Sequence, residues 1–218
     1  GFIAPQGTLT WNSQTTFVLP IEGSNETTFM FMGDRWSFPR QASAATYIWQ
    51  PLKIDGHKIS MPDFKEAWKI DLAKGVTSTT TVQGKIIAAS DKQITYNGNW
   101  QQDTLTVKSS DETGASFSFT ATGTQFGIYG LARPDGGYAS IIIRNSKGKT
   151  VLSSTVDMYS KYPDVVLKFL SPVFKKDIYT VTVTVLGEKW WWKEKSGRLS
   201  GSKGSFVSFE NIIALQAD

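Results

Sequence analysis

The chain has 218 residues, enough for one large β domain or for a small unit followed by a sandwich domain. Its net charge of +4 is small and its basic residues are scattered, which argues against a nucleic-acid-binding surface. Cysteine is absent and His57 is the single histidine, which excludes disulfides, thiolate nucleophiles and most zinc sites, and no apolar run is long enough to span a membrane.

Four short strands are predicted in the N-terminal third of the chain, over residues 15–21, 27–32, 46–54 and 68–72. Four consecutive short strands are the content of one blade of a β-propeller. A single blade leaves both of its faces open, so we expect it to pack on the following domain, on further blades or on a second chain. Residues 2–6 read as the interior of a domain, and we therefore expect the chain to be part of a longer protein.

A polar segment of small residues, 74–81, predicts a domain boundary near residue 75. We therefore assign residues 1–75 to a four-stranded, propeller-blade-like unit. Residues 76–218 are assigned to a second domain, which has the length of a jelly-roll β-sandwich.

The second domain is predicted to be antiparallel. Apolar residues alternate with Ser or Thr over residues 115–121 and 179–185, which is typical of strands with one buried face. Further strands are expected between turn signals, over residues 85–89, 94–100, 125–129, 138–144, 165–170 and 204–215. The predicted fold class is therefore all-β, with no helix longer than one or two turns.

Three motifs occur in order in the first unit: NSQTTFVLPI at 12–21, FMFMGDRW at 29–36 and YIWQPL at 47–52. Together they resemble the last blade of the five-bladed propeller in glycoside hydrolase family 43, and most closely its exo-β-1,3-galactanase branch. This resemblance covers about residues 3–72.

A second series of motifs resembles the galactose-binding-type jelly roll that is appended to many secreted glycosidases. The order of these motifs is more telling than any one of them. They are DKQITYNGNW at 91–100, TGTQFGIYG at 122–130, PDGGYA at 134–139, VDMYS at 156–160, VTVLGEK at 183–189 and FVSFE at 206–210. The resemblance implies an extracytoplasmic protein that handles galactose-containing polysaccharide.

The resemblance also implies that the chain alone is not a hydrolase. Family 43 enzymes draw their carboxylates from several blades, and glycoside hydrolysis needs an acid and a partner group across the scissile bond. The weak catalytic candidate is Gln14, because in the galactanases a glutamine in this Ser-Gln-Thr segment stands where a carboxylate base is expected. The alternative, a polar residue at the start of a strand, is favoured for the isolated chain.

Arg35 and Trp36 follow a predicted strand, so their side chains are expected at the end of that strand, where blades present ligand groups. The guanidinium of Arg35 suits paired sugar hydroxyls, although an ion pair with Asp34 explains it equally well. Trp49 and Trp68 are interpreted as core residues of the blade.

Trp190, Trp191 and Trp192 are the candidate carbohydrate-binding residues of the second domain. Successive side chains of a strand point to opposite faces, so at least one of these indoles is predicted to lie outside the core. Their position beside Gly187 predicts a strand end or loop tip. A sugar-stacking platform and a contact with the blade or a second chain are both open interpretations.

Neighbouring loops are expected to add sugar contacts through Tyr138, with Tyr159 and Tyr162. No cofactor is predicted, and the alternative is a structural Ca²⁺, which prefers oxygen ligands but lacks EF-hand spacing here. Its candidate ligands are Asp91, Asp111, Glu112, Asp157 and Glu210. A modest basic cluster is interpreted as a solvated loop, and it consists of Lys189, Lys193, Lys195, Arg198 and Lys203.

Three functions therefore compete. The first is a non-catalytic carbohydrate-binding part of a secreted glycoside hydrolase. The second is a galactosidase or galactanase that becomes active only with missing blades or by assembly with another chain. The third is a sandwich that supports the propeller and binds no sugar.

Overall fold

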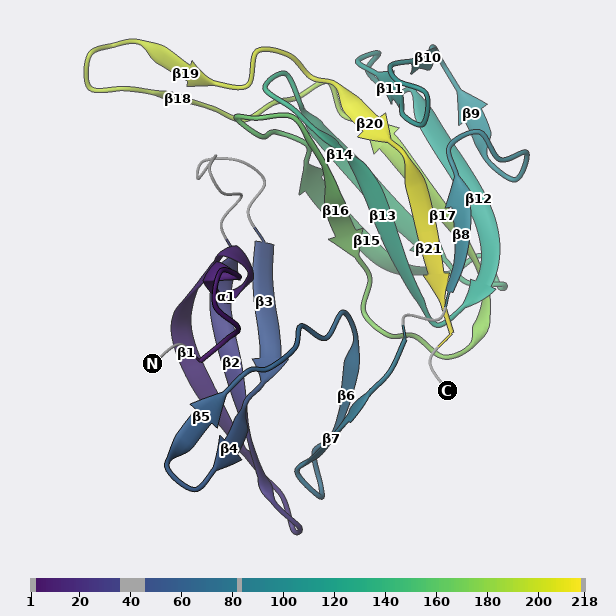
Figure 1. Cartoon of the computed structure of the whole chain (residues 1–218). Helices are drawn as coiled ribbons and strands as arrows, with labels where there is room; N and C mark the ends of the chain where they lie inside the picture. Colours follow the sequence, from purple (N-terminus) through teal and green to yellow (C-terminus); the bar gives the residue numbers. More distant parts are fainter. Residues whose placement is uncertain (1–2, 36–45, 82–83, 217–218) are drawn as a thin grey trace. The chain divides into compact units, whose positions relative to one another are not determined.

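The computed structural model describes residues 3–35, 46–81 and 84–216 (Figure 1). The predicted all-β class is confirmed, because one short helix, α1 (Leu9–Asn12), is the sole helix among these residues. Its four residues have φ angles between 49° and 58°, so that α1 is a single left-handed turn. Within the described part of the chain, no helix has the length and apolar character that crossing a membrane requires.

The chain divides into two compact units, Gly1–Val82 and Gln83–Asp218. The boundary that we expected near residue 75 lies within the first unit, in the turn of a hairpin made by β6 (Trp68–Asp71) and β7 (Val76–Thr79). The carboxylate of Asp71 accepts hydrogen bonds from the backbone N–H groups of Ala73 and Lys74 and so closes this turn. The polar segment therefore continues a hairpin and does not act as a linker.

Gly75 is required by this turn. Its φ is +74°, and a Cβ at this position would lie 1.9 Å from the carbonyl oxygen of Glu26. The hydroxyl of Thr28 donates a hydrogen bond of 2.7 Å to the carbonyl of Gly75. The segment that contains Glu26 and Thr28 thus packs against the turn of the β6–β7 hairpin and is hydrogen-bonded to it.

The main sheet of the first unit is antiparallel and has the order β1 (Ser13–Glu22), β2 (Thr27–Arg35), β3 (Thr46–Pro51). The fourth predicted strand does not join this sheet as a ladder strand, because β6 pairs with β7. Side-chain hydrogen bonds connect β6 and the segment before it to β3 instead. The buried amide of Gln50 bonds both backbone groups of Lys65, at 2.8 and 2.9 Å, and the indole N–H of Trp68 donates to the carbonyl of Trp49 at 2.9 Å. A further hairpin pairs β4 (Lys53–Asp55) with β5 (Lys58–Ser60).

The core of the first unit is small. The cluster of buried residues in its described part comprises Ala4, Phe31, Ile48 and Met61. Trp49 is 54% exposed, which corrects its interpretation as a core residue: β3 alternates, and it buries Ile48 and Gln50 on the opposite face. Three consecutive apolar residues of β1, residues 17–19, are also exposed.

The described residues of the second unit form two antiparallel sheets that pack face to face as a sandwich (Figure 1). The larger sheet consists, in order, of β15 (Thr150–Asp157), β14 (Tyr138–Arg144), β17 (Asp177–Val185), β12 (Ser116–Gly123) and β9 (Thr95–Asn97). The smaller sheet consists, in order, of β16 (Asp164–Leu170), β13 (Gln125–Ala132), β21 (Asn211–Leu215) and β8 (Gly84–Ala88).

Aromatic residues from both halves of the second unit build the core between the sheets. Phe117 on β12 stacks on Phe209 with ring centroids 4.1 Å apart, and both side chains are buried. Phe126 on β13 lies edge-on to Phe119 and Tyr179, at 6.1 and 5.6 Å. The predicted alternation is confirmed, since Phe117 and Phe119 point inward while Ser116 and Ser118 are only half-buried.

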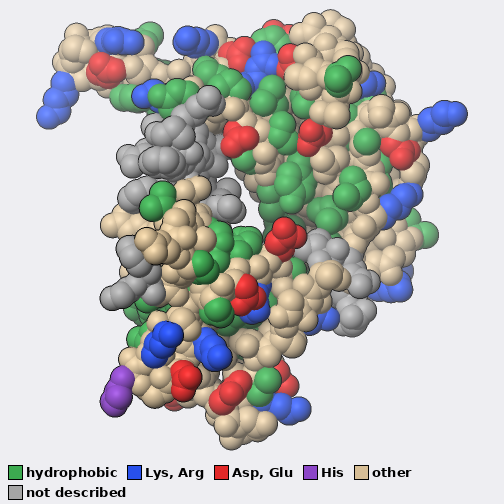
Figure 2. Space-filling view, in the orientation of Figure 1, with side chains coloured by type: hydrophobic (Ala, Val, Ile, Leu, Met, Phe, Trp, Pro, Cys, Tyr) green, Lys and Arg blue, Asp and Glu red, His purple; other side chains and the backbone are tan. Residues whose placement is uncertain are grey.

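Two small strand groups extend this sandwich. The first pairs β10 (Gln101–Gln102), β11 (Lys108–Ser110) and β20 (Val207–Phe209). The second is a hairpin of β18 (Trp191–Lys193) and β19 (Leu199–Gly201), which projects from the sandwich as an arm (Figure 1). Lys and Arg side chains lie along this arm in the space-filling view (Figure 2).

Candidate functional site

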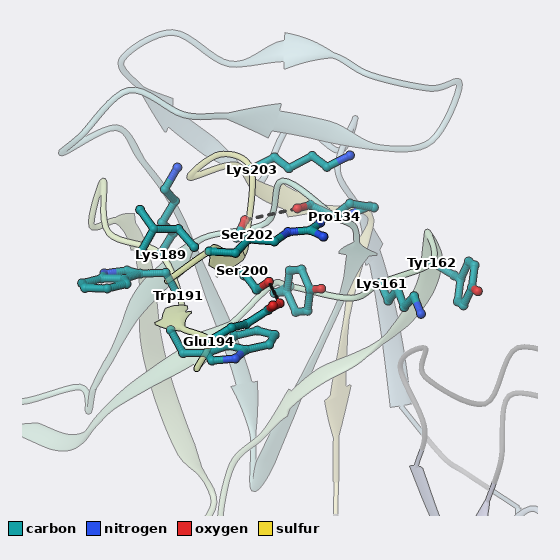
Figure 3. A pocket seen from close by; sticks show the side chains of 14 residues that line it. Pro134, Lys161, Tyr162, Lys189, Trp191, Glu194, Ser200, Ser202 and Lys203 are labelled. Atoms are coloured by element: carbon teal, nitrogen blue, oxygen red, sulfur yellow. Dashed lines mark hydrogen bonds between the residues drawn. The ribbon is translucent and has the colours of Figure 1, made fainter. Parts of the chain in front are cut away.

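A hollow of about 990 Å³ lies between the β18–β19 arm and two loops of the sandwich (Figure 3). One loop follows β13 and contains Pro134, and the other follows β15 and contains Tyr159 to Tyr162. All of its described lining residues belong to the second unit, and they are Pro134, Tyr159, Lys161, Tyr162, Lys189, Trp191, Trp192, Glu194, Arg198, Leu199, Ser200, Gly201, Ser202 and Lys203.

The arm is shaped by its turn and by a glycine. At the tip, the N–H of Glu194 donates to the carbonyl of Arg198 at 2.8 Å, and the N–H of Gly197 donates back to the carbonyl of Glu194 at 2.9 Å. At the base, Gly201 has a φ of +132°, and a Cβ there would lie 2.5 Å from the Cα of Trp191. The two strands therefore approach each other closely beside Trp191.

The three tryptophans confirm the prediction that at least one indole lies outside the core. Trp191 is 61% exposed and Trp192 is 42% exposed, and both border the hollow. Trp190 is half-buried, with its ring 5.2 Å from Tyr159 and 4.3 Å from Trp192. Trp190 thus packs against the exposed ring of Trp192 and connects it to Tyr159 of the sandwich.

The sandwich side of the hollow is held by hydrogen bonds. The N–H of Tyr159 donates to the carboxylate of Asp157 at 2.8 Å, and the hydroxyl of Ser160 donates to the carbonyl of Tyr162 at 2.6 Å. The carbonyl of Pro134 accepts from the N–H of Lys203 at 2.9 Å, which ties the end of the arm to the loop after β13. The tyrosines are therefore presented by an ordered loop.

Glu194 is the one carboxylate among the described residues that line the hollow. The hydroxyl of Ser200 donates to one of its oxygens (Figure 3). The hydroxyl of Ser196 lies 3.3 Å from the other oxygen. These bonds favour the charged carboxylate, so the hydrogen bond from Ser200 lowers the pKa of Glu194 most, with smaller help from the nearby guanidinium of Arg198. The carboxylate is thus held ionised and oriented.

We expect Ser200→Ala to raise the pKa of Glu194 toward the ordinary glutamate value, because the hydrogen bond that lowers this pKa most is lost. An NMR titration of the carboxyl carbon measures this shift. Since the pKa is lower in the folded chain, this bond stabilises the fold above the unfolded pKa of glutamate, and the contribution disappears as the pH falls through the folded pKa. Ser196→Ala is the matched control and should give a smaller rise. Equal pKa values in wild type and Ser200→Ala would contradict the assignment.

The structure brings only some of the predicted site residues together. Trp191 and Trp192 meet Tyr159 and Tyr162 at the hollow, and Trp190 supports them. Tyr138 begins β14 and is not a lining residue, although its N–H donates to the carbonyl of Glu188 at 2.8 Å, just before the arm.

The candidates of the first unit lie elsewhere. Gln14 is exposed on β1, opposite Asp34 in the ladder. Arg35 ends β2 opposite Ser13, and Trp36 lies outside the described residues.

The predicted calcium ligands do not gather. Among the described residues, no group of three or more His, Cys, Asp or Glu side chains is placed to hold a metal ion. Several candidates bind protein groups instead: Asp91 accepts from the N–H of Gln93, Glu112 from the N–H of Asn99, and Glu210 from the hydroxyl of Thr106. Each carboxylate thus closes a separate turn or strand contact.

Glu194, Ser200 and Lys161 were not predicted as site residues. Glu194 directly follows β18, and it meets Ser200 because the hairpin pairs β18 with β19. A glutamate six positions before a serine forms no recognisable sequence motif. Lys161 reaches the hollow from the loop after β15, a strand that was not predicted.

Comparisons with known proteins give solved structures of carbohydrate-active enzymes. No family model matches the sequence, and no curated protein matches it either. The chain is similar to an exo-β-1,3-galactanase of Phanerochaete chrysosporium, solved with β-1,3-galactotriose, at 19% identity over 98% of this chain and 46% of that chain, with a TM-score of 0.41. The same enzyme solved with galactose gives 18% identity and the same coverage and score.

Two other solved structures are similar to the chain. An exo-β-1,3-galactanase of Clostridium thermocellum gives 20% identity over 96% of this chain and 44% of that chain, with a TM-score of 0.29. A family two carbohydrate esterase of Cellvibrio japonicus gives 14% identity over 62% of this chain and 34% of that chain, with a TM-score of 0.41. The chain therefore spans less than half the length of the galactanases that it matches.

Proposed function

We propose that this chain is a non-catalytic carbohydrate-binding part of a secreted glycoside hydrolase, and that the hollow beside the arm binds galactose-containing oligosaccharide. The observation that carries this proposal is the pair of exposed indoles, Trp191 and Trp192, which line the same open hollow as two tyrosines. The galactose-binding-type motifs in the same unit support it, because they occur in the expected order from residue 91 to residue 210.

Sugar stacking accounts for the exposed indoles. The C–H face of a pyranose is apolar and packs on a flat ring, whereas its hydroxyls need hydrogen-bonding groups at the ring edge. The hollow supplies both kinds of group. The indoles provide the flat rings, and the ionised Glu194, which Ser200 holds by a hydrogen bond, can accept hydrogen bonds from sugar hydroxyls. Exposed aromatic rings without a cover lower solubility, so a ligand for these rings is a physical expectation.

The chemistry of Glu194 favours binding over hydrolysis. Carboxylate-based hydrolysis of a glycoside takes a protonated acid with a raised pKa and a second carboxylate a fixed distance away. Glu194 has a lowered pKa, and the other described lining residues contain no carboxylate. It therefore suits a hydrogen-bond acceptor for sugar hydroxyls and lacks the properties of a general acid.

We propose that the first unit is a blade-like piece of a family 43 propeller. Gln14 and Arg35 would contribute to the substrate site of that propeller once further blades are present. The exposure of Phe17, Val18 and Leu19 on β1 supports this proposal, because adjacent residues of a strand face opposite sides. Both sides of this edge are thus open to a neighbour. The alternative function is a galactosidase-type enzyme that works only with such neighbours, and the same exposed residues would form the contact with them.

Binding without turnover is the expected result for the purified chain. Calorimetry with galactose and β-1,3-galacto-oligosaccharides should show saturable binding, and added oligosaccharide should change the tryptophan fluorescence, because exposed indoles become covered. The same mixtures, and an aryl β-galactoside, should release no reducing sugar or aryl alcohol.

Two outcomes would contradict this assignment. Turnover that is lost in Gln14→Ala would show a competent active site on the first unit. Absence of binding to every oligosaccharide of a glycan array would leave the sandwich as a structural support for the propeller.

A further inference from the structure

The hollow is strongly basic. Four cationic side chains line it, against the single carboxylate of Glu194, and they are Lys161, Lys189, Arg198 and Lys203. They come from different segments: Lys161 from the loop after β15, Lys189 from the segment before β18, Arg198 from the tip of the arm and Lys203 from the segment after β19. In Figure 3 the three lysines lie around the rim of the hollow rather than on one side of it.

The protein offsets these cations only in part. None of the four forms an ion pair with a described residue. Two carboxylates offset part of this charge: the guanidinium of Arg198 helps to lower the pKa of Glu194, and Lys203 helps to lower the pKa of Asp135, whose ion pair is with Arg133. Four cations against one carboxylate leave the lining of the hollow with an excess of positive charge beside its aromatic rings.

We infer that the hollow selects a sugar with a negatively charged substituent, either the carboxylate of a uronic acid or a sulfate ester. This inference rests on the proposed carbohydrate-binding function and names its ligand class. A neutral galactose would satisfy the indoles of Trp191 and Trp192, but it would leave the cations without partners. An acidic sugar uses both features, because its apolar face stacks while its anion is paired by Lys or Arg.

A matched pair of ligands tests the inference. Galactose and galacturonate differ only in the group at C6, and galactose 6-sulfate supplies the alternative anion. Each cation at an exposed site is expected to strengthen binding about two- to fivefold. Calorimetry at low salt should therefore show that galacturonate or galactose 6-sulfate binds about tenfold more tightly than galactose. Added sodium chloride should reduce this difference and leave galactose binding unchanged.

Charge-removing variants locate the effect. We expect Lys189→Gln with Lys203→Gln to reduce the affinity for the acidic sugar to nearly that for galactose. Lys92→Gln is the matched control, because Lys92 is exposed on the same unit and does not line the hollow. The ratio of galacturonate to galactose 6-sulfate affinity assigns the anion to a carboxylate or a sulfate.

The outcomes separate this inference from the proposed function. Equal affinities for galactose and both acidic sugars would overturn the inference and leave carbohydrate binding intact. Binding of neither class would overturn the proposed function itself. Acidic sugar binding that survives Trp191→Ala but is abolished by salt would show ion attraction without sugar stacking, and it would also overturn the inference.

Discussion

Replacing Trp191 with alanine is expected to weaken oligosaccharide binding about thirtyfold or more while the melting temperature of the sandwich stays nearly unchanged. An aromatic anchor at the centre of a binding surface contributes about 2 kcal/mol or more, which corresponds to about thirtyfold in affinity. The indole of Trp191 is 61% exposed, so its removal takes little packing from the fold. Calorimetry and thermal unfolding of the same preparation measure both effects.

Trp49→Ala is the matched control for this experiment. Trp49 is exposed to a similar degree, 54%, but belongs to the first unit and does not line the hollow. Its substitution should leave sugar binding unchanged. A Trp191→Ala protein that binds sugar normally but loses about 3–5 kcal/mol of stability would show that the ring packs against protein and would defeat the stacking assignment.

Phe117→Ala is expected to cost about 3–5 kcal/mol of unfolding free energy, the largest stability effect predicted for the second unit. Phe117 is 1% exposed, stacks on Phe209 at 4.1 Å and lies edge-on to Trp100 at 5.5 Å. Phe117 lies in the core between the two sheets, and its β12 position pairs with Val183 on β17, so β12 cannot move to fill the cavity without losing its register. Urea denaturation, followed by circular dichroism, measures the change.

Leu105→Ala provides the comparison, because Leu105 is fully exposed and its loss should change stability by no more than about 0.5 kcal/mol. If Phe117→Ala lowered the free energy of unfolding by as little as Leu105→Ala, the aromatic stack would not be the centre of the core.

The sandwich strands were predictable where one face is buried. On β12 and β17, apolar residues alternate with Ser and Thr because the outer face of the sheet meets water. β15 was missed because its residues Thr150–Asp157 include no fully buried side chain, so no alternation marks it. β6 was predicted as a strand, but β7 was missed, since its Thr and Ser residues are as typical of loops as of exposed strands, and residues 74–81 were interpreted as a domain boundary.

The candidate site was predictable only in part. Strand geometry predicts only that at least one of the three indoles lies outside the core. Both Trp191 and Trp192 are exposed because all three residues of β18 are exposed in the arm, which alternation does not predict. Lys161 and Lys203, in contrast, are far apart in sequence and meet only because β15 ends beside the arm. The basic cluster was interpreted as a solvated loop. Three of its five members, Lys189, Arg198 and Lys203, line the hollow, whereas Lys193 and Lys195 do not.

The arm has a consequence for how tightly and how quickly a ligand is held. Its ladder consists of three residue pairs, from Trp191–Gly201 to Lys193–Leu199, and a two-stranded hairpin of this size is marginally stable by itself. The arm is therefore expected to open locally far more often than the sandwich unfolds, and each opening would move Trp191 relative to the other residues that line the hollow. For the proposed carbohydrate ligand, the affinity is reduced by the fraction of time that the arm spends open, but an open arm would let a long polysaccharide enter from the side, with no chain end to be threaded.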